Sequence, residues 1–270
     1  MPKKMMRQGV SMTIDTVLFD MGGTIEEVHF DRNQRLRSLP LLLGILAEEG
    51  IVLPGGDGSI LDTLLARNAE YKVWSEKTGV ESPPASIWLD WNLRDYDTDP
   101  EKVTRLAERL SYAWETGFFV RRMRKDAAET LEGLRKRGYK LGVISNTSSR
   151  TQVFRTLAEY GIEKYFSCVV LSSMEGIRKP EPAIFEAALR AVGSEAGTTA
   201  YVGDTISRDV IGSKRAGYAL AFLIRSFLTS GSDATVVPGA AEPDYVVDNL
   251  SRIVTVLDGI RAGMEPGMEP

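Results

Sequence analysis

The sequence predicts an α/β protein built on a doubly wound parallel sheet, and three observations lead to this prediction. Short apolar runs of strand length recur along the chain, and amphipathic segments of helix length lie between them. Each of these segments closes with a glycine suited to a helix C-terminus. Continuous apolar strands that alternate with helices indicate a parallel sheet covered on both faces.

The individual elements follow from the same pattern. Six apolar runs are expected to form the strands, namely residues 14–20, 140–145, 168–172, 200–204, 219–224 and 244–247. Four amphipathic segments are expected to form the covering helices, namely residues 126–138, 150–161, 182–193 and 208–217.

One interval departs from this alternation. Between about residues 28 and 120 no clear strand occurs, only helix-like segments that contain all four tryptophans. We expect an inserted all-helical cap domain over the strand ends, with the tryptophans in its core; the alternative is that one or two of them face the cleft. The predicted division is an N-terminal extension (1–12), an α/β core (13–27 and 120–260), a helical cap (28–119) and a disordered tail (261–270).

Composition narrows the classes of function. The formal net charge is -4, which argues against a general nucleic-acid binder. The basic run at residues 121–125 is expected to be a solvated hinge, with contact to an anionic substrate as the alternative. A single cysteine fits a reducing compartment, and no signal peptide or membrane span is visible, so we expect a cytoplasmic protein, monomeric or homodimeric.

Polar side chains follow four of the predicted strands, at the edge where open α/β sheets bind ligands. Taken singly, each is explained as a helix N-cap, but their joint occurrence on this topology is harder to dismiss. In chain order they are Asp20, Ser145, Asn146, Lys179, Asp204 and Asp209.

These residue types suit the transfer of a phosphoryl group. Asp20 and Asp204 offer hard oxygen ligands for Mg²⁺, and the Gly-Gly turn after Asp20 lets the backbone approach the ion and a phosphate. Lys179 offsets the negative charge, and Ser145 offers a hydrogen bond to a phosphoryl oxygen. An aspartate in this position can attack phosphorus and form an aspartyl-phosphate.

Four motifs occur in order, "FDMGGT", "ISNTS", "RKPEPAIF" and "VGDTISRDVIGSKRAG". In them the chain resembles the haloacid dehalogenase-like (HAD) hydrolase superfamily, from about residue 14 to residue 257, with the insertion placed like that family's helical C1 cap. The resemblance implies a Rossmann-like core with Asp20 as the nucleophile. It also implies a Mg²⁺ ion bound by Asp20, the carbonyl of Gly22 and Asp204.

The resemblance assigns further roles near the same site. Asp209 would belong to the metal site by orienting a water on the ion or Lys179. Gly23 and Thr24 would shape the phosphate loop, and we expect Asn146 to contribute to phosphate binding.

One position departs from the family pattern. Phosphatases of this family usually carry a second aspartate two residues after the nucleophile, as the general acid and base, and here that position is Gly22. Such catalysis is typically worth ~10²–10⁴-fold. A substitute acid from the following loop or cap, or substrates with good leaving groups, would explain the change. The candidate substitutes are Glu26, Glu27, His29 and Asp31, whose other interpretation is a solvated loop.

The sequence therefore predicts a Mg²⁺-dependent hydrolase, a phosphatase acting on a small phosphorylated metabolite. The alternative is a protein that binds phosphorylated ligands with little or no turnover. A more distant alternative is hydrolysis of a C–P or C–halogen bond. Hydrolysis of C–P bonds in this family uses an early cap lysine, whereas Lys72 and Lys77 come later and are expected on a solvated helix surface.

Overall fold

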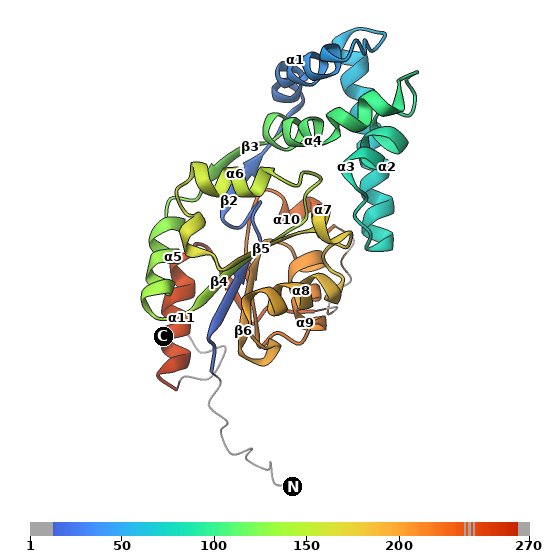
Figure 1. Cartoon of the computed structure of the whole chain (residues 1–270). Helices are drawn as coiled ribbons and strands as arrows, with labels where there is room; N and C mark the ends of the chain where they lie inside the picture. The colour runs from blue at the N-terminus through green and yellow to red at the C-terminus, as the bar shows by residue number, and fades with distance from the viewer. Residues whose placement is uncertain (1–12, 235, 237–238, 240, 264–270) are drawn as a thin grey trace.

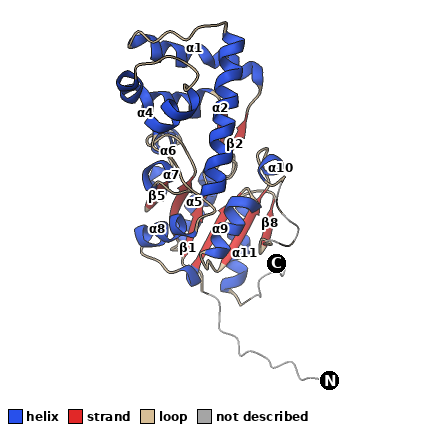
Figure 2. Cartoon of the chain, turned by 90° about the vertical axis from the view of Figure 1, so that its right-hand side faces the viewer, coloured by secondary structure: helices blue, strands red, loops and turns tan. Residues whose placement is uncertain are grey.

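The structure is a computed structural model that describes residues 13–234, 236, 239 and 241–263. It consists of an α/β core and a helical unit above one edge of the sheet (Figures 1 and 2). The predicted N-terminal extension and residues 264–270 of the predicted tail lie outside the described residues. No helix in the described ranges is long and apolar enough to cross a membrane.

The core sheet has six parallel strands in the order β5-β4-β1-β6-β7-β8. This topology confirms the predicted doubly wound α/β class, and each strand begins and ends within two residues of its predicted bounds. The strands are β1 (Thr16–Phe19), β4 (Lys140–Ser145), β5 (Cys168–Leu171), β6 (Thr199–Gly203), β7 (Leu220–Ile224) and β8 (Tyr245–Val247).

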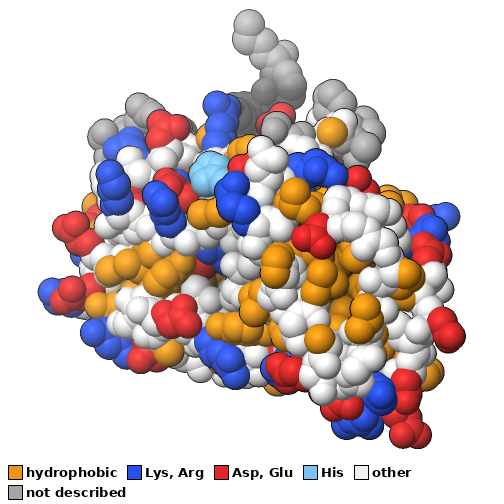
Figure 3. Space-filling view, turned by 90° about the horizontal axis from the view of Figure 1, so that it is seen from above, with side chains coloured by type: hydrophobic (Ala, Val, Ile, Leu, Met, Phe, Trp, Pro, Cys, Tyr) orange, Lys and Arg blue, Asp and Glu red, His pale blue; other side chains and the backbone are white. Residues whose placement is uncertain are grey.

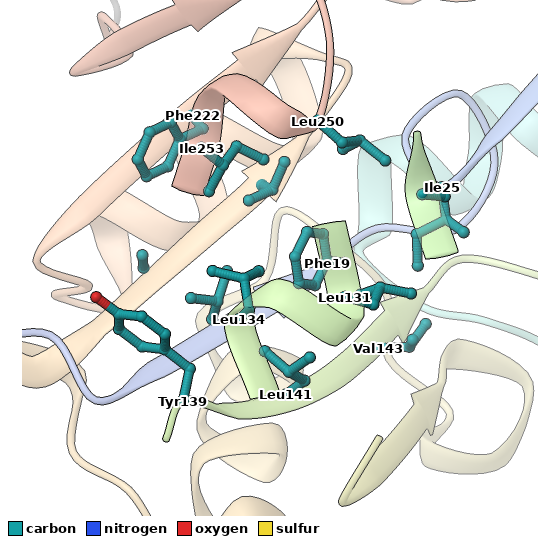
Figure 4. Packing of buried hydrophobic residues seen from close by; sticks show 14 of the residues in the cluster. Phe19, Ile25, Leu131, Leu134, Tyr139, Leu141, Val143, Phe222, Leu250 and Ile253 are labelled. Atoms are coloured by element: carbon teal, nitrogen blue, oxygen red, sulfur yellow. The ribbon is translucent and has the colours of Figure 1, made fainter. Parts of the chain in front are cut away.

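Helices cover both faces of this sheet. On one face Phe19 of β1 packs with Leu131 and Leu134 of α5 and with Ile253 of α11 (Figure 4). The next residue back along β1, Leu18, packs on the opposite face against α8, as the two-residue period of a strand requires. The first face carries α5 (Ala127–Lys136), α6 (Gln152–Glu159) and α11 (Ser251–Arg261), and the second carries α8 (Pro182–Val192) and α9 (Ile211–Arg215).

Short helical turns complete the connections of the core. They are η2 (Glu163–Tyr165), α7 (Ser172–Glu175), η3 (Ala196–Thr198), η4 (Ile206–Val210) and α10 (Thr229–Ser232).

A two-stranded antiparallel sheet joins the core to the helical unit, where the sequence showed no clear strand. Its strands are β2 (Glu26–His29) and β3 (Val120–Met123). In β2 the residues Glu26 and Val28 are buried, whereas Glu27 and His29 are exposed. Buried and exposed residues alternate along β2 as in any strand. The strand is short, however, and its first buried residue is the charged Glu26, so the alternation does not stand out in the sequence.

The helical unit has its own apolar core, formed within residues 39–118. Trp88 and Trp114 are buried in it, as the sequence predicts, while Trp74 and Trp91 lie partly buried beside Tyr71. The helices are α1 (Arg32–Glu48), α2 (Asp57–Thr78), α3 (Pro84–Ser86), η1 (Ile87–Asn92) and α4 (Pro100–Gly117). We call this unit the cap; the residues at which it meets the core remain a prediction.

The outer face of the molecule, seen from above in Figure 3, mixes charged side chains of both signs with hydrophobic ones. Exposed ion pairs also join α1 to α4, such as Arg109 with Glu48 at 2.6 Å. No broad field of positive charge covers the face drawn in Figure 3. That the protein does not bind nucleic acid stays a prediction.

Helix α4 of the cap is tied to the core by two carboxylates. Glu108 accepts hydrogen bonds from the backbone amides of Arg150 (3.0 Å) and Thr151 (3.1 Å), just before α6. It also accepts from the Ser149 hydroxyl at 2.7 Å. About two helical turns further along α4, Glu115 accepts from the amide of Ser148 at 3.2 Å. The cap therefore fixes the loop that follows β4.

A second connection joins the C-terminal end of α2 to the core on the other side of the cleft. Glu81 accepts a hydrogen bond from Ser172 at 2.7 Å and lies 3.5 Å from the guanidinium of Arg178. Tyr71 also donates to Glu81. These contacts are buried, so the cap rests on the core along two separated lines.

Replacing Glu108 with alanine should loosen the first connection. Charge-assisted hydrogen bonds contribute about 1.5–3 kcal/mol, so Glu108→Ala should lower the midpoint of thermal unfolding and speed hydrogen exchange at the amides of Arg150 and Thr151. The control is Glu132→Ala, which removes only an exposed pair with Lys136. Unchanged exchange at both amides in Glu108→Ala would contradict this account.

Candidate active site

The predicted site residues meet because their strands end together. In the register, Phe19 of β1 lies beside Val143 of β4 and Val202 of β6. Asp20, directly after β1, donates its backbone N–H to the carbonyl of Val202 at 2.8 Å. Asp204 comes directly after the end of β6, so the two carboxylates lie at adjoining strand ends, as expected from the sequence.

Lys179 lies between two carboxylates. Its Nζ donates to Asp20 Oδ1 at 2.6 Å, to Asp209 Oδ1 at 2.7 Å and to the Tyr201 hydroxyl at 3.0 Å. The side chain is only 2% exposed. Burial alone favours the neutral amine, but the two carboxylates outweigh it and raise the pKa of Lys179. The amine is therefore a fixed positive charge.

The backbone of Lys179 is held by the residue that follows Ser145. Asn146 accepts the Lys179 N–H at 2.9 Å and donates to the Lys179 carbonyl at 3.0 Å. Its predicted contribution to phosphate binding stays a prediction, since both side-chain polar atoms already serve Lys179. Ser145 lines the cavity described below and is 5% exposed.

Asp204 has an unusual environment for a carboxylate. Its Oδ2 accepts from the Ser226 hydroxyl at 2.5 Å, whereas its buried Oδ1 has no hydrogen-bond partner among the described residues. Burial, with Asp20 and Asp209 nearby, raises the pKa of Asp204 to about 8. Burial also raises the pKa of Asp20, although Lys179 opposes it.

This environment fits a divalent cation. Oxygens of Asp20, Asp204 and Asp209 all lie within 4.8 Å of one another. Asp209 already uses Oδ1 for Lys179 and Oδ2 for the Thr205 hydroxyl at 2.6 Å. The unpaired Oδ1 of Asp204 and the carboxylate of Asp20 therefore remain for a hard cation, which prefers such oxygens.

The Gly-Gly turn brings the backbone close to Asp204. Gly23 has a φ of 92°, and a Cβ on it would lie 2.1 Å from Asp204 Oδ2, so no side chain fits here. Thr24 is buried, and its hydroxyl has no partner in the described part of the chain. Arg124 holds this turn by donating to the carbonyls of Gly23 (2.7 Å) and Thr24 (2.8 Å).

A cavity of about 620 Å³ lies between the cap and the core. Its floor includes Asp20, Ser145 and Lys179, and aromatic side chains such as Trp114 and Phe119 form part of its wall. Trp114 thus belongs both to the cap core and to the cleft.

Lys72 also lines this cavity, which corrects the expectation that it lies only on a solvated helix surface. Its Nζ is 5.9 Å from the centre of the Phe119 ring. The side chain stays exposed to the cleft, but the surrounding protein desolvates it and lowers the pKa of Lys72. The spacing of apolar residues along α2 does not reveal that the face carrying Lys72 is turned toward the core.

None of the four proposed substitute acids lines the cavity. Glu26 is buried and paired with Arg121, and Asp31 caps α1 by accepting the Gln34 amide at 2.8 Å. Glu27 and His29 are exposed on β2. In this arrangement of the cap none of the four side chains reaches the cavity. The solvated interpretation holds for Glu27 and His29 but not for the buried Glu26. A substitute acid from this segment stays an open alternative.

Three residues at the site were missed in the sequence. Tyr201 lies on β6, and its hydroxyl accepts a hydrogen bond from Lys179. Ser226 follows β7, and its hydroxyl donates to Asp204. Arg208 lines the cavity, and the nearby Asp209, Asp204 and Asp20 outweigh its burial and raise its pKa. Only Arg208 had a sequence signal, since it lies beside Asp209 in "GDTISRD".

Replacing Gly23 with alanine should displace Asp204. The strain of a positive φ costs about 1–2 kcal/mol, and overpacking against Asp204 adds about 1–3 kcal/mol. The control is Gly138→Ala, at a φ of 87° with no atom within 4 Å of the new Cβ, which carries only the strain. Urea unfolding of both variants measures the difference. Equal losses of stability would show that Asp204 does not pack against this turn.

Comparison with known proteins places the chain among relatives of one family. Haloacid dehalogenase-like hydrolase domain-containing protein 3 of Mus musculus is 32% identical over 166 residues, 61% of this chain and 62% of the mouse protein. Glyceraldehyde 3-phosphate phosphatase of Methanopyrus kandleri is 35% identical over 171 residues, 63% of this chain and 70% of that protein. These matches thus leave more than a quarter of each relative uncovered.

A solved structure, a HAD phosphatase from Thermococcus onnurineus, covers 91% of this chain and 99% of its own with a TM-score of 0.56 and 25% identity. The profile of the family described as haloacid dehalogenase-like hydrolase matches residues 14–217. That match spans well over half of the chain and confirms the resemblance seen in the four motifs. The protein belongs to the haloacid dehalogenase-like hydrolases.

Proposed function

We propose that the protein is a Mg²⁺-dependent phosphatase that acts on a small phosphorylated metabolite. The observation that carries this proposal is the Lys179 ammonium between Asp20 and Asp209, beside the unpaired oxygen of Asp204, on the floor of the cavity between cap and core. The names of relatives support the class of reaction, among them the M. kandleri enzyme and a phosphoglycolate phosphatase of Haemophilus influenzae that is 30% identical over 173 residues.

In this mechanism Asp20 attacks phosphorus. Lys179 occupies its Oδ1, which leaves Oδ2 as the attacking atom. The bond between phosphorus and the leaving oxygen breaks, the electron pair stays on that oxygen, and an aspartyl-phosphate forms on Asp20. Water then attacks the same phosphorus and restores the carboxylate. Lys179 and the hydroxyl of Ser145 stabilise the phosphoryl oxygens through both steps.

Asp20, Asp204 and the carbonyl of Gly22 would hold Mg²⁺, which supplies positive charge next to the phosphoryl group. Asp209 contributes by holding Lys179 in place, since both its oxygens are already engaged.

Binding of a phosphorylated ligand without turnover is the second candidate. The absence of an acidic side chain at Gly22 favours it, because nothing at that position donates a proton to the leaving oxygen. The first test below separates the two candidates.

Replacing Asp20 with asparagine should lower Mg²⁺-dependent release of phosphate by at least roughly 10³-fold, because the amide is a poor nucleophile. The assay uses p-nitrophenyl phosphate and acetyl phosphate, with phosphonates and haloacids run alongside. The control is Asp15→Asn, just before β1 at the opposite edge of the sheet, which should keep its turnover.

Retained turnover in Asp20→Asn would remove Asp20 as the nucleophile. No release of phosphate by the unmodified protein from any phosphate would favour the ligand-binding candidate. Release of halide or cleavage of a phosphonate instead would point to chemistry at carbon.

Stabilisation by Mg²⁺ should depend on pH through Asp204. Its pKa of about 8 in the metal-free fold lies above the ordinary 3.8, so the folded protein holds that proton more tightly than the unfolded chain. This contribution to stability is present below pH ~4 and is lost as the pH rises toward ~8. Mg²⁺ requires the ionised carboxylate, so its effect grows over the same interval.

The measurement is the rise in unfolding temperature on adding Mg²⁺, which we expect to be larger at about pH 9 than at about pH 6. Asp204→Asn should lose this dependence, and the control Asp15→Asn should keep it. A rise that is equal at both pH values in the unmodified protein would contradict the assignment of Asp204 to the metal site.

A further inference from the structure

The guanidinium of Arg121 lies where the missing acid would be. A Cβ built on Gly22 would be 3.3 Å from Arg121 Nη1, its nearest atom outside the local chain. Arg121 lines the same cavity as Asp20 and Gly22. A positive charge therefore borders the space that a side chain at position 22 would fill. Arg121 lines the cavity, which corrects the expectation that it belongs to a solvated hinge.

This guanidinium is held rigidly by two carboxylates. Nη1 donates to Glu26 Oε2 at 2.9 Å, and Nη2 donates to Glu115 Oε2 at 2.8 Å. Nε donates to the Glu115 carbonyl at 2.9 Å, and the Tyr160 hydroxyl donates to the other oxygen of Glu26 at 3.0 Å. The two carboxylates outweigh burial and raise the pKa of Arg121, so it stays charged.

Its donors are not exhausted by these contacts. A guanidinium carries five N–H groups, and the three hydrogen bonds above use one each on Nε, Nη1 and Nη2. One N–H on Nη1 and one on Nη2 of Arg121 therefore have no acceptor among the described residues. Nη1 is also the atom that faces position 22.

We propose that Arg121 replaces the missing acid by charge, donating a hydrogen bond from Nη1 to the leaving oxygen as its bond to phosphorus breaks. This inference rests on the proposed function. The electron pair stays on the leaving oxygen, which departs as an anion and takes its proton from water after release. Arg121 supplies no proton, because a guanidinium does not deprotonate in proteins.

The proposal assigns a class of substrate. Without a proton donor at position 22, weakly basic leaving oxygens depart most readily, and a positively charged donor stabilises them as anions. Acyl phosphates, whose leaving group is a carboxylate, and aryl or enol phosphates meet this condition. Simple alkyl phosphates do not.

It also explains why an aspartate at position 22 would not act as a general acid in this chain. An aspartate introduced there would contact Arg121 and pair with it, and the ion pair would keep the carboxylate ionised and unable to donate. Arg121 therefore takes the place of an acid at position 22, and the two groups would not function together.

The first experiment measures kcat/KM on aryl phosphates of graded leaving-group basicity. The variant is Glu26→Gln/Arg121→Gln, which removes one positive and one negative charge together, because loss of Arg121 alone would leave Glu26 buried and unpaired. The loss of one such donor typically costs roughly 10²–10³-fold. We expect this loss on the most basic leaving groups and only about tenfold on the least basic ones.

Two further variants serve as controls, and thermal unfolding confirms that each is folded. Glu26→Gln alone keeps Arg121 and should keep the shallow dependence on leaving-group basicity. Arg122→Gln, at the neighbouring exposed position of β3, should match the unmodified protein.

A second experiment uses position 22 itself. Gly22→Asp alone should raise turnover of an alkyl phosphate less than about tenfold, because Arg121 holds the new carboxylate ionised. Gly22→Asp in the Glu26→Gln/Arg121→Gln background should raise it by about 10²-fold or more and add a fall in rate at high pH, as a general acid does.

The outcomes separate the two proposals. A loss that is equal for every leaving group would show that Arg121 only positions the cap, and it would overturn this inference while leaving the phosphatase proposal intact. A strong gain from Gly22→Asp alone would overturn it as well. No phosphate release by the unmodified protein would overturn the phosphatase proposal and this inference with it.

Discussion

The site depends on one buried ammonium. Asp20, Asp204 and Asp209 bring three carboxylates within 4.8 Å of one another in the interior, and Lys179 contacts two of them directly. Removing one partner of a buried ion pair typically costs 3–5 kcal/mol, because the remaining charge is left uncompensated. Asp204, which Lys179 does not contact, shows the consequence in its raised pKa. The fold therefore leaves one negative position in the cluster open to a further cation.

The core and the cap make different contributions to this site. The core supplies the charges. Strand register places Asp20 and Asp204, and hydrogen bonds between Lys179 and Asp209 place the other two. The cap supplies the walls, and α4 links them to the chemistry. Glu115 on that helix contacts both Ser148, in the loop after β4, and Arg121 on β3. A displacement of α4 would thus move the loop next to Ser145 and the guanidinium next to Gly22 together.

The sequence predicts the core of the site because parallel strands must end at a common edge. Asp20 and Asp204 are close for that reason alone, and the apolar runs that carry them are unmistakable. The pairing of Glu26 with Arg121 has no such signal, because the two residues are 95 positions apart and each looks like a solvated charge. Lys72 also looks like a surface charge in the sequence, and it is exposed, but toward the cavity. The surroundings of a charged residue depend on which elements pack around it, and that information belongs to tertiary packing.

Replacement of the acid by Arg121 would assist the first step of the reaction but not the second. In the usual arrangement one carboxyl group protonates the leaving oxygen and then activates water in the second step. A guanidinium serves the first step by charge, but it cannot accept a proton from water, and Glu26 is already paired with it. Hydrolysis of the aspartyl-phosphate would then lack a base at this position and become the slower half of the cycle. With glycine at position 22, Arg121 would compensate for the missing acid in the first step, whereas nothing at that position would activate water in the second.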